Sequence, residues 1–139
     1  MSTAVLYTPE VLGLAIALAR YPLTDDLPLR GEARSKSCGS TIALGLALAA
    51  DGTIARIGIR TQACAIGQAA AAIFAQDAVG MRAEAIQRTR ADLVAWLAGE
   101  GALPDWPGLA GIAAARDYPA RHGAVLLAWT AATQALSTA

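Results

Sequence analysis

The chain has 139 residues, no formal net charge at pH 7, 55% hydrophobic residues and 16% charged residues. This composition excludes a disordered segment, and the balanced charge provides no electrostatic footprint for nucleic acid. No uncharged run is a solid apolar block of about 20 residues, and Glu10 interrupts the first apolar stretch, so neither a membrane span nor a signal peptide is predicted. Residues 1–139 are expected to form one cytoplasmic domain.

The first predicted element is a helix that begins at Thr8-Pro9-Glu10, which supplies a capping threonine, a proline at the first helical position and an acid in the first turn. The pair Tyr21-Pro22 ends it. Residues 24–36 contain proline, glycine and three acids, and are predicted to supply an edge strand that leads into Cys38.

An antiparallel hairpin is predicted next. Residues 42–48 and 55–60 each alternate with period two, and Asp51-Gly52 lies between them as a turn. Paired positions in such a hairpin have a constant sum of residue numbers, here near 103. The sum for Cys38 and Cys64 is 102, so we expect the two thiols side by side at the open end of the hairpin.

Helices are predicted for the remainder of the chain. The alanine-rich segment after Cys64 is strongly helical up to Val79-Gly80, and residues 82–99 form a second helix. The expected buried stripe of the 82–99 helix consists of Ile86, Leu93, Trp96 and Leu97. A loop follows, then a brief helix over 109–115, and a last helix is predicted from Tyr118-Pro119 with Val125, Trp129, Ala132 and Leu136 on one face. This order predicts an α+β fold, in which helices pack on one face of a small antiparallel three-stranded sheet.

The two cysteines are the strongest candidates for chemistry. In a reducing cytosol, two neighbouring thiols indicate metal binding or reactivity more than a disulfide. The alternative is that both cysteines are small apolar side chains buried in the core, with no chemical role. Cys64 comes immediately before a predicted helix, whose N-terminus favours the negative charge of a thiolate. His122 is the one histidine of the sequence and a candidate third ligand, because soft metals accept thiolate together with imidazole. Water, a partner's group, Asp77 or Asp117 would complete a tetrahedral site.

No enzyme active site is predicted. The sequence has a single histidine, no Gly-x-Ser-x-Gly elbow and no phosphate-loop spacing of glycines. A nucleophile and a base therefore cannot be paired from these residues, and we expect a protein that is not an enzyme.

Several motifs together resemble a known family. The similar segments are Cys38-Gly39-Ser40, the Asp51-Gly52 hairpin and the run from Gln62 to Ile73. In these segments the chain resembles the U-type iron–sulfur cluster assembly scaffolds, namely IscU, the NifU N-terminal domain and SufU. The tail Tyr118-Pro-Ala-Arg121, followed by Leu127-Ala-Trp129, is most similar to the SufU branch. The resemblance spans nearly the whole chain and implies the same α+β fold.

The resemblance also shows departures at ligand positions. Ser40 stands where the family has an aspartate, and Ala124 stands where it has a third cysteine. The histidine that precedes this cysteine in IscU would fall at Gly123, so His122 is offset by one residue. The metal-binding roles therefore carry over to Cys38 and Cys64, with His122 as a substitute third ligand.

The function implied by the resemblance is that of a scaffold-like protein in iron–sulfur cluster assembly. Such a protein binds iron, an iron–sulfur cluster or zinc through its cysteines, takes sulfur from a cysteine desulfurase and passes the cluster to apo acceptor proteins. Two alternatives remain open. One is a persulfide carrier for the desulfurase, and the other is a degenerate interaction module of the assembly machinery that binds no metal.

Overall fold

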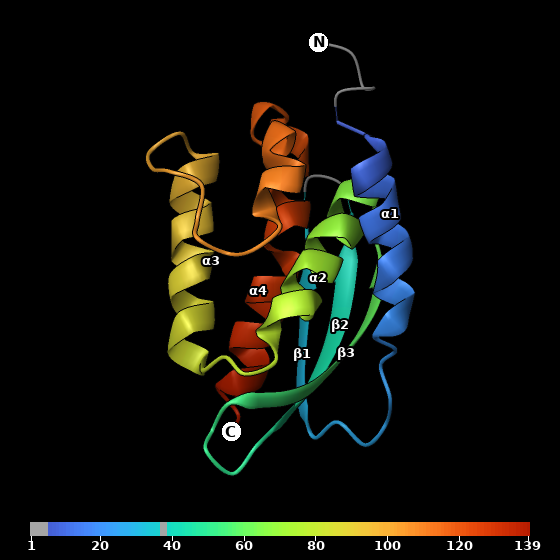
Figure 1. Ribbon diagram of the computed structural model, residues 1–139, viewed down its shortest axis with the longest axis vertical. Helices are drawn as coiled ribbons and strands as arrows, with labels where there is room; N and C mark the ends of the chain where they lie inside the picture. The colour runs from blue at the N-terminus through green and yellow to red at the C-terminus, as the bar shows by residue number, and fades with distance from the viewer. Residues whose placement is uncertain (1–5, 37–38) are drawn as a thin grey trace.

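The computed structural model describes residues 6–36 and 39–139. Helices cover one face of a sheet, and α2 and α4 lie in the helical layer between α1 and α3 (Figure 1). In chain order the elements are α1 (Pro9–Ala17), η2 (Leu18–Arg20), β1 (Leu29–Arg34), β2 (Thr41–Leu48), β3 (Ile54–Gln62), α2 (Ala65–Ala78), α3 (Ala83–Leu97), η3 (Leu109–Asp117), η4 (Pro119–Arg121) and α4 (His122–Leu136), where η denotes a 3₁₀ helix. The predicted α+β class is confirmed.

Within the described residues, the strands form a three-stranded antiparallel sheet in the order β1-β2-β3. The predicted hairpin register is confirmed from Thr41 opposite Gln62 to Ala47 opposite Arg56, since each of these pairs sums to 103. The register shifts after Ala47, close to the turn, where Gly52 has a φ of 87°. The predicted edge strand is also confirmed, because β1 pairs with β2.

The helix-covered face of the sheet carries the apolar positions of the strands. Ile42, Leu44 and Leu46 alternate on β2 and are all buried against the helical layer. Strand residues one position apart point to opposite faces, so the period-two pattern of the sequence becomes one buried face and one polar face.

The predicted helix boundaries are close to those of the structure. The Thr8 hydroxyl accepts a hydrogen bond from the Val11 backbone N–H at 3.2 Å, as expected for a helix cap. In α3 the buried residues are the predicted stripe, Ile86, Leu93, Trp96 and Leu97. The last helix differs, because Tyr118-Pro119 starts the 3₁₀ turn η4 and the α-helix begins only at His122.

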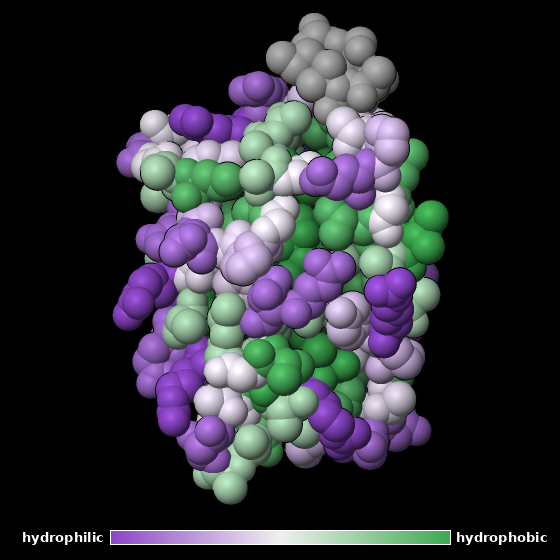
Figure 2. Space-filling model, viewed as in Figure 1, coloured by the Kyte–Doolittle hydropathy of each residue, from purple (hydrophilic) through white to green (hydrophobic). Residues whose placement is uncertain are grey.

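Helix α1 leaves an apolar surface uncovered. Leu12 and Ile16, one turn apart, are 47% and 76% exposed. Figure 2 shows hydrophobic side chains along the edge of the molecule over this helix. No helix of residues 6–36 and 39–139 combines the length and apolar character that crossing a membrane requires.

The polar face of the sheet is covered over half of its length. The chain between η2 and β1 crosses it, and a Cβ atom at Gly45 would lie 2.9 Å from the Cβ atom of Leu27. At Gly58 a Cβ atom would overlap the carbonyl oxygen of Pro22 and lie 2.8 Å from the Leu23 Cα atom. The absence of a side chain at these two glycines therefore lets the covering segment lie directly on the sheet. The segment stops short of the two rows that contain Glu32 and Arg34.

Candidate functional site

Three segments that are distant in the sequence meet at one end of the sheet, which we call the tip. They are the connection between β1 and β2, the junction between β3 and α2, and the first turn of α4. A Cβ atom at Gly123 would overlap the Ser35 hydroxyl oxygen and lie 3.1 Å from the Ser35 Cβ atom. A Cβ atom at Gly67 would lie 3.3 Å from the Cβ atom of Ala124. Glycines in α2 and α4 therefore let these segments approach closely.

Cys64 is at the strand-to-helix junction, as predicted. It is a free, half-buried cysteine that occupies the N-cap position of α2. Its carbonyl oxygen accepts a hydrogen bond from the Gln68 N–H at 3.0 Å, and the Gln68 side chain donates to the Ala63 carbonyl at 2.8 Å. The junction is thus held by Gln68, and Cys64 occupies the N-cap position of a helix whose first N–H groups have no partner within the helix.

Cys38 lies outside the described residues, so the predicted pairing of the two thiols stays a prediction. The described ends of its connection are bonded to each other. The Ser35 N–H donates to the Ser40 carbonyl at 2.8 Å, and the Gly39 N–H donates to the Ser35 carbonyl at 2.9 Å. Ser35 and Ser40 are each only 3% exposed, so the base of this connection is part of the folded core.

His122 is half-buried at the first position of α4, and its ring is already hydrogen-bonded. Its Nε2 atom lies 2.7 Å from the Arg116 carbonyl oxygen. A carbonyl oxygen only accepts hydrogen bonds, so Nε2 donates the hydrogen of this contact and Nδ1 is the ring nitrogen left for another partner. Any ligation by His122 would therefore use Nδ1.

The other candidate ligands are not gathered around Cys64. Asp77 is near the C-terminal end of α2, about 20 Å from Cys64 along the helix axis. Asp117 is exposed at the end of η3. Within residues 6–36 and 39–139, no three His, Cys, Asp or Glu side chains form a group that could hold a metal ion.

The first turn of α4 supplies no thiol to the tip. Ala124 is 1% exposed and faces the position of Gly67, and the space beside Gly123 is filled by Ser35. A histidine at position 123 would require Ser35 to move. In this chain the first turn of α4 therefore has no room for a side chain at position 123.

The contact between Gly123 and Ser35 can be tested by a double-mutant cycle. Gly123→Ala is expected to destabilise the protein by about 1–2 kcal/mol, because the new methyl group overlaps the Ser35 hydroxyl. In a Ser35→Gly background the same change should cost much less, since the overlapping atoms are gone. Urea unfolding of the four proteins measures this coupling, and additive effects would show that the two residues do not press on each other.

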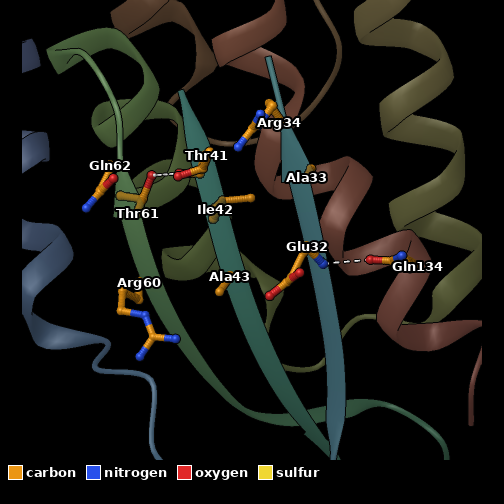
Figure 3. Close-up of a pocket in the computed structure, with 10 residues that line it drawn as sticks. All are labelled: Glu32, Ala33, Arg34, Thr41, Ile42, Ala43, Arg60, Thr61, Gln62 and Gln134. Atoms are coloured by element: carbon orange, nitrogen blue, oxygen red, sulfur yellow. Dashed lines mark hydrogen bonds between the residues drawn. The ribbon is translucent and has the colours of Figure 1, made fainter. Parts of the chain in front are cut away.

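A groove that the sequence analysis did not predict lies next to the tip, on the polar face of the sheet (Figure 3). It has a volume of about 570 Å³. Its floor is formed by Thr41 and Ala43 of β2, and its walls by residues of β1 and β3 and by Gln134 of α4, whose side chain accepts a hydrogen bond from the Glu32 N–H at 2.6 Å. The signal in the sequence was the polar residue at every second strand position, but periodicity does not reveal which rows remain uncovered.

Solved structures with the same fold are known. The crystal structure of a nitrogen-fixing NifU-like protein (N-terminal) from Brucella abortus aligns with a TM-score of 0.87 at 26% identity, covering 96% of this chain and 94% of that chain. A protein from Fervidobacterium islandicum AW-1, described as an iron–sulfur cluster assembly scaffold for the SUF system, aligns with a TM-score of 0.85 at 17% identity, covering 97% and 99%.

A third structure, of a hypothetical protein, aligns with a TM-score of 0.69 at 17% identity and covers 91% of this chain and 96% of that chain. No protein-family model and no curated protein sequence matches the chain. The similarity is therefore visible in the arrangement of the elements, while most side chains differ.

Proposed function

This chain has the fold of the U-type iron–sulfur cluster assembly scaffolds, and from that premise we propose that it is a scaffold-like protein of cluster assembly. In this proposal Cys38 and Cys64 hold the cargo, which is iron, an iron–sulfur cluster or zinc. A cysteine desulfurase supplies the sulfur, and apo acceptor proteins receive the product. The protein itself is not an enzyme.

The observation that carries the proposal is the position of Cys64. Its free thiol is half-buried at the N-cap of α2, where three segments of the chain converge. A helix N-terminus stabilises a thiolate, which is the form that binds metal or attacks a persulfide. Partial burial leaves the sulfur accessible to a partner protein.

The set of donor atoms suits a temporary cargo better than a permanent metal. Two thiolates and Nδ1 of His122 would leave a four-coordinate metal ion one ligand short, and Ala124 adds nothing. A closed structural site uses four protein ligands, whereas an open position lets cargo enter and leave. The chain's own residues therefore favour transfer over storage.

A persulfide carrier is the second candidate, favoured by the absence of a thiol from the first turn of α4. In that reaction the Cys64 thiolate attacks the outer sulfur of a desulfurase cysteine persulfide. The S–S bond of the donor breaks, a new S–S bond forms on Cys64, and the donor leaves as a thiolate, so atoms and electrons balance. This reaction needs one accessible thiolate and no metal.

Metal and sulfide content distinguishes these candidates. Iron, zinc and acid-labile sulfide should be measured per chain after anaerobic purification and after reconstitution with iron, sulfide and desulfurase. For the scaffold-like protein we expect near-stoichiometric metal that is lost in Cys64→Ser and in the Cys38→Ser/Cys64→Ser double variant. A wild-type protein that stays metal-free, but gains a persulfide after desulfurase turnover, would overturn the scaffold proposal and support the carrier.

Ala124→Cys is expected to strengthen cargo binding. Ala124 is buried in the first turn of α4 and faces Gly67, the third residue of α2, so a thiol there would enter the tip from the opposite helix. A third thiolate should slow the loss of iron or zinc to a chelator relative to wild type. Ala124→Ser, which adds a hydroxyl of similar size, is the matched control. Equal rates of loss for the two variants would contradict a site at the tip.

A further inference from the structure

The polar face of the sheet carries two pairs of arginines that differ in their contacts. On the covered half, Arg30 donates to the carbonyl oxygens of Leu27 at 2.8 Å and Thr24 at 2.6 Å. On the same half, Arg56 forms an ion pair with Asp26 at 2.8 Å. Both of these arginines hold the segment that crosses the sheet, so their charges already serve the fold.

The second pair lies on the open half. Arg34 and Arg60 are exposed, and neither side chain forms an ion pair or hydrogen bond with any described residue. Both line the 570 Å³ groove. Figure 3 shows Arg34 and Glu32 pointing from β1 over the neighbouring strand. Within the part of the chain that the structure describes, these two guanidinium groups thus flank a concave surface without a counter-ion.

The register of the sheet places the two arginines within reach of one ligand. Arg34, Thr41 and Gln62 form one row across the sheet. Glu32, Ala43 and Arg60 form the next row. Strands β1 and β3 are two strand spacings apart, so the Cα atoms of Arg34 and Arg60 are about 12 Å from each other on the diagonal. Both side chains are long enough to reach an anion over β2, where Ala43 presents only a methyl group and the Glu32 side chain lies directly opposite it.

We propose that this groove docks an acidic, extended segment of the protein that exchanges cargo with the tip. The inference deepens the proposed function, on which it rests for the identity of the partner. Carboxylates of such a segment would pair with Arg34 and Arg60. Glu32, which lies opposite Ala43 inside the groove, would accept a backbone N–H or repel a carboxylate that entered in the wrong register. Thr41 and Gln62 add hydrogen-bonding groups.

The shape of the groove favours a polypeptide over a small molecule. Sites for small ligands enclose most of the ligand and are lined mainly by apolar groups, whereas this groove is open and polar. It also continues to the tip, since Gln62 is two residues before Cys64. A chain lying along it would be anchored beside the thiol that its own protein has to reach.

Binding of a labelled peptide tests the proposal. The probe is a fluorescein-labelled peptide of alternating glutamate and alanine, with a glutamine–alanine peptide as its neutral counterpart, and the readout is fluorescence anisotropy at low salt. We expect the Arg34→Gln/Arg60→Gln variant to bind about tenfold more weakly than Arg20→Gln/Arg88→Gln, which removes the same charge from exposed sites on η2 and α3. Glu32→Gln should bind about two- to threefold more tightly, and added salt should weaken binding.

Two results would overturn the proposal. One is equal affinity of the groove variant and its control, and the other is displacement of the peptide by succinate at equal concentration, which would identify a site for small carboxylates. Cys64→Ser should bind the peptide as wild type does while losing its cargo. A failed groove and a failed cargo site are therefore seen in separate measurements.

Discussion

Replacement of Gly31 by alanine is expected to destabilise the folded protein by about 3 kcal/mol or more. A Cβ atom at this position would overlap the carbonyl oxygen of Ala131 in α4 and lie 2.8 Å from its carbonyl carbon and 3.1 Å from the Ala135 nitrogen. All of these are backbone atoms of a helix, so they cannot move aside as a side chain would. Relief of the overlap requires α4 to separate from β1.

Urea unfolding, followed by circular dichroism, measures this loss. Gly13→Ala is the matched control, because Gly13 is in the middle of α1 and a Cβ atom there would meet nothing within 4 Å. That change should stabilise the protein by up to about 1 kcal/mol through the higher helix propensity of alanine. Similar stabilities for the two variants would contradict the close packing of α4 on the sheet.

Trp129→Ala is expected to cost about 3–5 kcal/mol, a large part of the stability of a domain of this size. Trp129 is 0% exposed, and its ring meets those of Phe74 at 5.3 Å and Trp106 at 5.4 Å in edge-to-face geometry. Phe74 and Trp106 stack on each other at 5.5 Å. Removal of the Trp129 ring leaves a cavity bordered by the other two aromatic side chains.

The loss should reach beyond the cavity, because Trp106 belongs to the segment that joins α3 to η3. Its indole N–H donates to the Ile73 carbonyl at 3.0 Å and so ties this segment to α2. Trp129→Phe keeps an aromatic ring and should cost clearly less. Thermal unfolding of both variants provides the comparison, and equal losses would show that the ring cluster contributes little.

These packing contacts also support the tip. Helix α4 carries Trp129 of the aromatic cluster and packs on Gly31 of β1. In its first turn, Gly123 lies against Ser35 and Ala124 lies against Gly67. The position of the β1–β2 connection relative to Cys64 therefore depends on how α4 docks on the sheet. A variant that shifts α4 is expected to disturb cargo binding even though it changes no ligand.

Much of the fold was predicted from local patterns. Alternating apolar residues and the Asp51-Gly52 turn determined the hairpin register, because side chains on a strand have a period of two. Thr8-Pro9 determined the start of α1, and the spacing from Ile86 to Leu97 determined the buried side of α3. The placement of Cys64 at the start of a helix followed from the same local signals.

Contacts between distant segments were decided only by the tertiary structure. The sequence did not predict that α4 packs directly on Gly31 or that Ser35 fills the space beside Gly123. It also did not predict the hydrogen bond between the His122 ring and the Arg116 carbonyl oxygen. It also did not distinguish Arg30 and Arg56, which hold the covering segment, from Arg34 and Arg60, which do not.

The physical reason is the range of the interactions. Propensity, capping and periodicity act over a few residues, so a single sequence contains them in readable form. The shape of the tip and the open half of the sheet depend instead on which backbones approach one another after folding. The residues that build those surfaces have neighbours that are far away along the chain.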